Sequence, residues 1–178
     1  MSKKNRILII GSEGAVGQAI YEVLNATRNN IIFRLGRSLP KQSYDEDNFL
    51  YVDLDIFSSC QRVEEKYCFD TVIYLAGIWK GKTLEMQNLF ENAFPFFNFI
   101  NTIAKSAKHI IYFSSSAVYG KRNIFNENLL NEMPDSSYGV SKLLSERFLV
   151  DFCKKNSKQY TLFRPFHITS LFEKYNPG

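Results

Sequence analysis

A tyrosine and a lysine four residues apart, Tyr138 and Lys142, are the pair whose residue types and spacing point most directly to chemistry. If the segment around them is helical, both side chains lie on one face, one turn apart. Their unperturbed pKa values are about 10, so neither group transfers protons readily at neutral pH. A cation beside the phenol favours the phenolate and brings the tyrosine into the catalytic range. The same spacing also occurs on solvated helix faces, so the pair requires a cofactor site and a third group.

A cofactor site is predicted from the segment ILIIGSEGAVG, residues 7–17. Gly11, Gly14 and Gly17 follow an apolar run directly and precede an amphipathic stretch that begins with Ala15 and Val16. Glycines in this context permit a tight turn and a close backbone approach to a pyrophosphate, and the helix N-terminus adds partial positive charge. Flexible turns alone would also explain isolated glycines. The strand before and the helix after favour dinucleotide binding by this loop.

The elements that must position these residues alternate regularly along the chain. Six apolar runs have the length and the β-branched or aromatic content of buried strands, at residues 6–10, 31–36, 49–52, 71–76, 109–114 and 160–164. Helix-like segments lie between them, at residues 15–27, 58–66, 88–106 and 136–156. Parallel strands need crossover connections of this kind. The sequence therefore predicts an α/β fold, a Rossmann-type doubly wound parallel sheet with helices on both faces, in one domain over residues 1–178.

The bulk composition predicts an ordinary globular chain. The 178 residues are 45% hydrophobic and 22% charged, and the net charge of +4 comes from 22 basic and 18 acidic residues that are scattered along the sequence. A scattered excess of this size gives no reason to expect a nucleic-acid partner. The three cysteines, Cys60, Cys68 and Cys153, form no metal-like cluster. The apolar run near the N-terminus is too short for a signal peptide or a membrane span, so we expect a cytoplasmic protein without a membrane partner.

The glycine spacing G-x-x-G-x-x-G resembles that of the extended short-chain dehydrogenase/reductase superfamily, which contains nucleotide-sugar epimerases, dehydratases and reductases. The segment VDLD resembles the family's adenine-binding pair, which implies that Asp53 accepts from the exocyclic amine and Leu54 packs on the ring. Asp53 could instead cap a following turn. These matches imply a bound NAD or NADP.

Two further segments resemble the family in the expected order. YLAGIW resembles the family's HxAG segment, which implies that Leu75, Ala76 and Gly77 pass close to the ribose and nicotinamide. Asn92 stands where the family has an asparagine that supports the central helices and approaches the cofactor. The alternatives are a loop glycine for Gly77 and a helix-surface amide for Asn92.

The resemblance also implies a catalytic set. FSSSAVYG, residues 113–120, resembles the family's SSxxVYG segment, whose serine or threonine hydrogen-bonds the reacting oxygen of the substrate. Counting back from VYG selects Ser115, and counting forward from the strand end selects Ser116. We predict Ser115, with Ser116 as the alternative. The roles implied are general acid/base for Tyr138, and ribose anchor and pKa modulator for Lys142, both of which also contact the cofactor.

Two positions bear on the cofactor and the substrate. The second predicted strand ends RLGRS without a carboxylate, so Arg37 and Ser38 could grip the 2′-phosphate of NADP, and we favour NADP over NAD. FRPFH, residues 163–167, resembles a family segment in which Phe166 would flank the nicotinamide. His167 replaces the usual asparagine that touches nucleotide-sugar phosphates, which weakens the sugar-nucleotide inference.

The resemblance implies an NAD(P)-dependent epimerase, dehydratase or reductase that acts on a nucleotide-sugar-like substrate by hydride transfer. The chain ends before the family's C-terminal substrate domain, which we expect to be absent or truncated. The alternative is a dinucleotide-binding module without turnover, such as a sensor, a partner subunit or a remnant. The family also implies a possible homodimer, in which the two long predicted helices of each copy form a four-helix bundle.

Overall fold

The structure is a computed structural model, which describes residues 4–37, 48–78, 86–121 and 132–168. Six strands, four α-helices and two short 3-10 helices are found in this part of the chain. In chain order they are β1 (Asn5–Ile10), α1 (Ala15–Thr27), β2 (Asn30–Gly36), β3 (Phe49–Tyr51), α2 (Phe57–Lys66), β4 (Thr71–Tyr74), α3 (Met86–Asn101), η2 (Ile103–Lys105), β5 (His109–Phe113), η3 (Ser116–Tyr119), α4 (Ser137–Lys155) and β6 (Gln159–Phe163).

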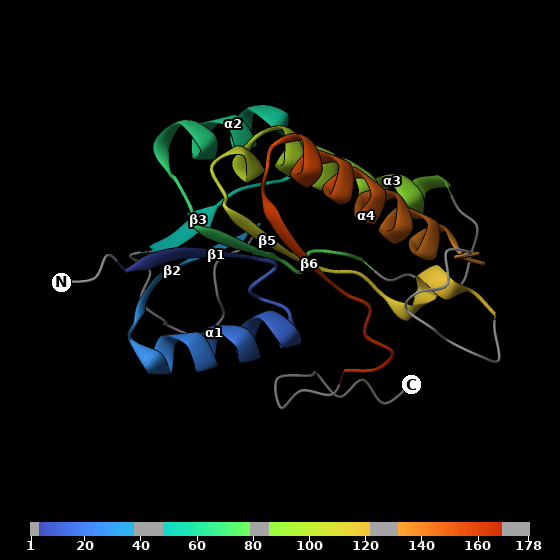
Figure 1. Ribbon diagram of the computed structural model, residues 1–178, viewed down its shortest axis with the longest axis horizontal. Helices are drawn as coiled ribbons and strands as arrows, with labels where there is room; N and C mark the ends of the chain where they lie inside the picture. Colours follow the sequence, from blue (N-terminus) through green and yellow to red (C-terminus); the bar gives the residue numbers. More distant parts are fainter. Residues whose placement is uncertain (1–3, 38–47, 79–85, 122–131, 169–178) are drawn as a thin grey trace.

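The six strands form one sheet in the order β3-β2-β1-β4-β5-β6 (Figure 1). All described pairs are parallel, and Leu8 of β1 lies opposite Phe33 of β2 on one side and Val72 of β4 on the other. The chain first builds outwards from β1 to β3 and then returns to the other side of β1. The carboxyl ends of β1 and β4 therefore flank the point where the strand order reverses, which is where open α/β sheets bind ligands.

Helices cover both faces of the sheet, which confirms the predicted Rossmann-type fold. Figure 1 shows α2, α3 and α4 on one face and α1 on the other. Alternation along β1 directs Leu8 and Ile10 into the larger hydrophobic cluster, which includes Phe96 and Phe99 of α3. Ile7 and Ile9 point to the other face, into a smaller cluster beside α1. Both faces of β1 are therefore buried, as its unbroken apolar run predicts.

The element boundaries differ from the prediction mainly at α3 and β4. The long helix predicted to reach residue 106 ends at Asn101, where the Thr102 hydroxyl donates to the carbonyl of Asn98 at 2.6 Å and a 3-10 turn follows. The strand predicted over residues 71–76 ends at Tyr74. The residues after Tyr74 leave the sheet and are available to build a site.

Helix α4 begins where the sequence predicts. Ser136 is its N-cap, and the Ser136 hydroxyl accepts a hydrogen bond from the N–H of Gly139 at 3.1 Å. The cap fixes the first turn of the helix, which carries Tyr138. Tyr138 and Lys142 are both helical, so the four-residue spacing places them on one face.

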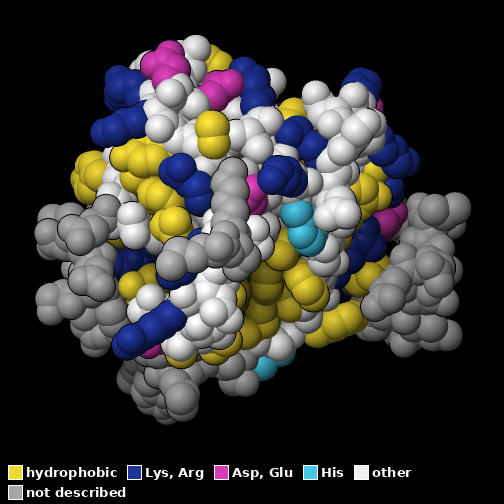
Figure 2. All heavy atoms as spheres, turned by 60° about the vertical axis from the view of Figure 1, so that its left-hand side comes forward, with side chains coloured by type: hydrophobic (Ala, Val, Ile, Leu, Met, Phe, Trp, Pro, Cys, Tyr) yellow, Lys and Arg dark blue, Asp and Glu magenta, His cyan; other side chains and the backbone are white. Residues whose placement is uncertain are grey.

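The charge distribution agrees with the scattered pattern in the sequence. On the face drawn in Figure 2, the lysines and arginines that the structure describes are spread among acidic and apolar side chains. They form no continuous basic surface on that face.

Candidate active site

The glycine loop lies against the start of the segment that follows β4. Gly11 has φ +83°, and a Cβ atom built there would lie 2.9 Å from the backbone nitrogen of Ala76. A Cβ at Gly17 would lie 2.7 Å from Cα of Ser12, within the loop itself. Only glycine satisfies both the backbone angle at Gly11 and the close packing at Gly17. Gly14 is the N-cap of α1, whose first turn carries no acidic residue, so the positive end of the helix dipole opens at the switch point.

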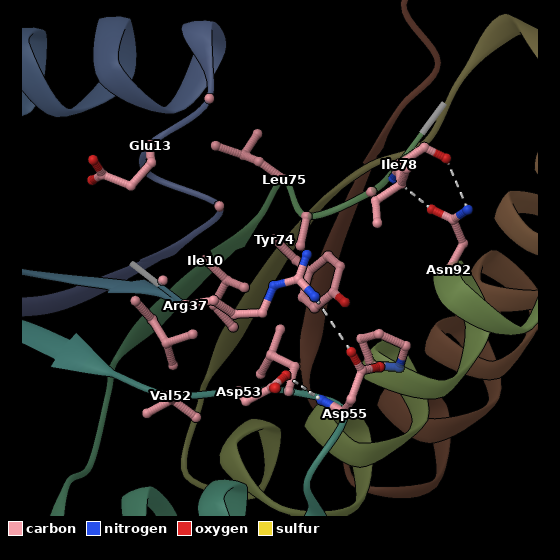
Figure 3. A pocket seen from close by; sticks show the side chains of 18 of the residues that line it. Ile10, Glu13, Arg37, Val52, Asp53, Asp55, Tyr74, Leu75, Ile78 and Asn92 are labelled. Carbon is pink, nitrogen blue, oxygen red and sulfur yellow. Dashed lines mark hydrogen bonds and ion pairs between the residues drawn. The ribbon is translucent and has the colours of Figure 1, made fainter. Parts of the chain in front are cut away.

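A cavity of about 300 Å³ opens beside this loop, at the carboxyl ends of β1 to β4 and against α3 (Figure 3). Most of the predicted cofactor-binding residues line it, namely Gly11, Gly14, Arg37, Asp53, Leu54, Leu75, Ala76, Gly77 and Asn92. Residues that the sequence did not single out also line it, including Glu13, Asp55, Tyr74, Ile78, Glu91 and Pro95. The cavity thus brings segments that are far apart in the sequence together around one pocket.

One wall of the pocket is acidic. Arg37 pairs with Asp55 across 3.5 Å, and both side chains are about half exposed. Burial raises the pKa of Asp55, as does the nearby Asp53, whereas Arg37 acts in the opposite direction. Asp53 also accepts from the N–H of Asp55 at 3.1 Å, so it caps the turn in the manner of the alternative considered for it. Ser38, the second residue of the predicted phosphate grip, lies outside the described residues.

Asn92 fixes the segment after β4 from the side of α3. Its Oδ1 accepts from the N–H of Ile78 at 2.7 Å, and its Nδ2 donates to the carbonyl of Ile78 at 2.9 Å. Figure 3 shows this double contact at one end of the pocket. The amide is therefore a buried clamp and not a helix-surface group, and it holds Gly77 close to the next element of the site.

The side chain of Lys142 lies next to Gly77 and is the second polar group of the site. It is 3% exposed, and its ammonium donates to the carbonyl of Phe113 at 3.0 Å and to that of Ala76 at 3.4 Å. Burial lowers the pKa of Lys142 to about 8, and the carboxylate of Glu146 opposes this change. A Cβ at Gly77 would lie 3.0 Å from Nζ, so the glycine leaves room for the ammonium. Lys142 thereby connects the pocket wall to the end of β5.

Tyr138 lies one turn earlier on α4, with its ring centroid 5.7 Å from Nζ of Lys142. Burial raises the pKa of Tyr138, and a hydrogen bond with the Ser115 side chain acts in the opposite direction. Lys142 alone therefore does not produce the low pKa that the sequence predicts for this phenol. Of the two serines considered, Ser115 is the one that meets Tyr138; Ser116 begins η3, and its backbone N–H donates to the carbonyl of Pro165 at 3.0 Å.

Other predicted cofactor contacts lie around the pocket and do not line it. Ala15 and Val16 form the first turn of α1, and Gly17 is buried behind the loop. Phe166 follows β6, is 61% exposed and stacks on the ring of Tyr119 at a centroid distance of 6.2 Å. The structure does not bring Phe166 to the pocket wall.

A buried ionic cluster supports the helix that carries the Tyr–Lys pair. Arg164 at the end of β6 donates to both carboxylate oxygens of Glu146, at 2.9 and 2.6 Å, and to Glu132 at 2.7 Å. These hydrogen bonds, above all those with Glu146, raise the pKa of Arg164. Glu146 is one turn after Lys142, so the cluster fixes α4 against β6 directly behind the site.

The chain matches the model of one known protein family over nearly its whole length. Residues 7–177 match the model of the NAD dependent epimerase/dehydratase family. The chain belongs to the NAD-dependent epimerase/dehydratase family. This assignment agrees with the superfamily that the glycine loop, the serine segment and the Tyr–Lys pair resemble.

Several epimerases are similar over nearly the whole chain. ADP-L-glycero-D-manno-heptose-6-epimerase of Alkalilimnicola ehrlichii is 25% identical over 184 residues, which cover 97% of this chain and 56% of that protein. The crystal structure of the Helicobacter pylori enzyme of the same name is 25% identical, with a TM-score of 0.74 over 90% of this chain and 55% of its own. UDP-glucose 4-epimerase of Thermus thermophilus, in complex with NAD, is 19% identical, with a TM-score of 0.75 over 89% of this chain and 54% of its own. The chain thus spans about half the length of these relatives.

The pocket fits the dinucleotide that gives the epimerase/dehydratase family its name. Gly11 and Gly17 carry no side chain, so the loop packs tightly and its backbone can approach a pyrophosphate at the positive N-terminal end of α1. The acidic and apolar walls offer acceptors and ring contacts for an adenosine. In the described parts of the chain, His, Cys, Asp and Glu form no group that could hold a metal ion, and no helix is long and apolar enough to cross a membrane.

Glu13 is a charged pocket residue that the sequence interpretation missed. The glycine pattern treats its position as a variable one between Gly11 and Gly14. A carboxylate inside a phosphate-binding loop is unfavourable next to a pyrophosphate. Its presence at this position was therefore a sign in the sequence that the Glu13 side chain serves another purpose.

Proposed function

We propose that this chain binds a nicotinamide dinucleotide in the pocket and oxidises a carbinol carbon of a nucleotide-sugar-like substrate, with Tyr138 as the acid/base. The position of Lys142 carries the proposal. Its ammonium is hydrogen-bonded to Ala76, a residue of the pocket wall, and to Phe113, which ends the strand before Ser115. The buried ammonium of Lys142 thus lies between the pocket wall and the segment that carries Ser115, whose side chain forms a hydrogen bond with Tyr138.

The residues have separate tasks in this reaction. When bound, the dinucleotide supplies the hydride acceptor for conversion of the carbinol to a carbonyl. The Ser115 hydroxyl holds the substrate oxygen, and the phenol oxygen of Tyr138 takes the hydroxyl proton and later returns it. Lys142 anchors the ribose and, as a cation, favours the phenolate. Asn92 and Glu146 keep the wall segment and α4 in place.

The substrate class is supported by the relatives. Two of the similar proteins are ADP-heptose epimerases and one is a UDP-glucose epimerase, so a sugar linked to a nucleoside diphosphate is the substrate to test first. Epimerisation, dehydration and reduction all begin with this oxidation or its reverse. The non-catalytic alternative, a dinucleotide-binding module, shares the pocket but needs neither Ser115 nor Tyr138.

We also propose that α3 and α4 form a homodimer interface. The two helices pack side by side, and several aromatic rings on them remain exposed, including Phe90, Phe94 and Phe148. Exposed aromatic groups clustered on adjoining helices are a common feature of interfaces. Packing against the same helices of a second copy would bury them in a four-helix bundle.

Dinucleotide titration and a Tyr138→Phe variant test the enzymatic proposal. Calorimetric titration of the 178-residue chain with NAD, NADH, NADP and NADPH should show saturable binding. With ADP- and UDP-sugars as substrates, Tyr138→Phe should lower turnover about 10²- to 10⁴-fold, because it removes the proton-transfer group. Dinucleotide affinity should change far less, because the aromatic ring stays and only the hydroxyl is removed.

The matched control is Tyr160→Phe, which removes a phenol from the exposed surface of β6 and should leave turnover unchanged. Binding without turnover in the unaltered chain would favour the dinucleotide-binding module. Turnover that survives Tyr138→Phe would exclude the proposed acid/base. A folded chain that binds no dinucleotide would contradict both functions.

A further inference from the structure

A carboxylate lies at the end of β2, although β2 itself contributes none. The strand ends at Gly36, and Arg37 follows it. The missing carboxylate comes from the glycine loop: a Cβ atom at Gly36 would lie 3.5 Å from Cγ of Glu13. Glu13 also lines the pocket, and Figure 3 places it at the end opposite Ile78 and Asn92.

Buried partners hold Glu13 in this position. Its Oε1 lies 3.7 Å from Nη1 of Arg34 and accepts from the Ser12 hydroxyl at 3.2 Å. Arg34 is 3% exposed, and its guanidinium lies over the rings of Tyr21 and Phe49, at 4.5 and 5.4 Å from their centroids. A guanidinium packed between two rings and a carboxylate is fixed in orientation. The Glu13 side chain is still 27% exposed, so a ligand in the pocket can reach it.

A carboxylate at the end of the second strand decides between the two nicotinamide dinucleotides. In doubly wound sites it accepts hydrogen bonds from the adenosine ribose of NAD and repels the 2′-phosphate of NADP. Both contacts of Glu13 described above fall on Oε1, so within the described part of the chain Oε2 is left as an acceptor for a ribose hydroxyl. Arg37, on which the NADP prediction depends, faces Asp55 instead.

We propose that Glu13, held against Gly36 by Arg34, is the ribose-binding carboxylate of this chain and makes the pocket select NAD over NADP. The proposal rests on dinucleotide binding by this pocket. It reverses the NADP preference that the sequence suggested. The sequence at the end of β2 contains no carboxylate, because the carboxylate comes from the loop before α1.

Calorimetric titration of the 178-residue chain and two variants tests the proposal. The unaltered chain should bind NAD at least about tenfold more tightly than NADP, the effect expected from one charge-assisted hydrogen bond. Glu13→Gln should weaken NAD about tenfold or more and bring the two affinities close together. Glu91→Gln removes one carboxylate from the other part of the same pocket and should leave the NAD-to-NADP ratio unchanged.

A ligand change isolates the contact from any effect on folding. NAD that lacks the 2′-hydroxyl of the adenosine ribose should bind the unaltered chain about tenfold more weakly than NAD. The same two ligands should bind Glu13→Gln almost equally. Because both ligands are compared on the same protein, a change in the folded fraction cancels in the ratio of the two affinities. Thermal unfolding of each variant measures separately whether the loss of the Glu13 charge disturbs the packing of Arg34.

The outcomes separate this inference from the proposed function. A folded chain that binds neither dinucleotide contradicts dinucleotide binding itself. Binding with equal or greater affinity for NADP leaves the proposed function intact and overturns the role of Glu13. The role is also overturned if Asp55→Asn, and not Glu13→Gln, removes the preference for NAD, because the Arg37–Asp55 pair would then be the determinant.

Discussion

Lys142 is the residue at which the pocket and the candidate catalytic pair meet. Its ammonium is buried among backbone carbonyls, and no carboxylate of the described residues pairs with it directly, which is the physical reason for its low pKa of about 8. At neutral pH the folded chain therefore carries a buried cation at a cost in stability. The same buried position places the cation close to Tyr138, where it favours the phenolate in the proposed reaction.

This burial predicts a pH dependence of stability. Between the folded pKa of about 8 and the unfolded value of 10.5, the unfolded chain binds a proton that the folded chain does not. The free energy of unfolding should therefore rise with pH through this window, by about 3 kcal/mol from this residue. In Lys142→Met this part of the rise should be missing. Urea unfolding at both ends of the window measures it.

The control for the pH experiment is Lys154→Met, which removes an exposed lysine from the last turn of the same helix. Its stability should follow that of the unaltered chain across the window. Equal slopes for Lys142→Met and the unaltered chain would show that the ammonium is not desolvated.

At the scale of elements, the contact between α4 and β6 decides whether the site keeps its shape. Tyr138 and Lys142 both lie on α4, and the Arg164 cluster behind them ties this helix to the end of the edge strand β6. Glu146 has only 3% of its side chain exposed, so its charge depends on Arg164 for compensation. The position of the Tyr–Lys pair is therefore coupled to an ion pair between α4 and the end of β6.

Removing one partner of this pair should be costly. Arg164→Met should lower the free energy of unfolding by about 3–5 kcal/mol, because it leaves the Glu146 carboxylate buried and unpaired. The double variant with Glu146→Met should recover most of this loss. Lys155→Met, which breaks the exposed pair with Asp151, should cost less than about 1 kcal/mol. Urea unfolding of the three variants measures these costs, and a cost for Arg164→Met no larger than for Lys155→Met would contradict the buried-pair argument.

At the scale of the whole molecule, three of the four described α-helices cover one face of the sheet (Figure 1). Two of them, α3 and α4, carry exposed aromatic rings in addition to the rings they bury. Phe90 and Phe94 pair at 5.5 Å, and Phe97 packs on Phe148 at 4.8 Å, so the exposed rings form contacts along and between the helices. This arrangement supports the proposed dimer and predicts which substitutions separate the copies.

Phe94→Glu and Phe148→Glu should each shift the chain from dimer to monomer, because a charge in the buried centre of an interface is left unpaired. Sedimentation equilibrium over a range of concentrations measures the change. Tyr51→Glu introduces the same charge at an exposed aromatic position on β3 and should leave the association unchanged. A monomeric unaltered chain at the highest concentrations, or a dimer that tolerates both phenylalanine substitutions, would rule out this interface.

The amino-acid sequence alone was sufficient to predict the fold class, the glycine loop and the one-turn spacing of Tyr138 and Lys142. These features depend on local periodicity: apolar runs of strand length, glycines in a fixed frame and a four-residue step within one helix. The predicted cofactor-binding segments also meet at one pocket, because the carboxyl ends of parallel strands lie at the same edge of the sheet.

The contacts between groups distant in the sequence could not be predicted and come from the packing of the folded chain. It brought Ser115 to Tyr138, closed Asn92 onto Ile78 and placed the loop residue Glu13 at the end of β2. It also set the direction in which the pKa values of Tyr138 and Lys142 move. The physical reason is that burial and contact depend on how segments distant in sequence pack against each other, and local periodicity carries no record of that packing.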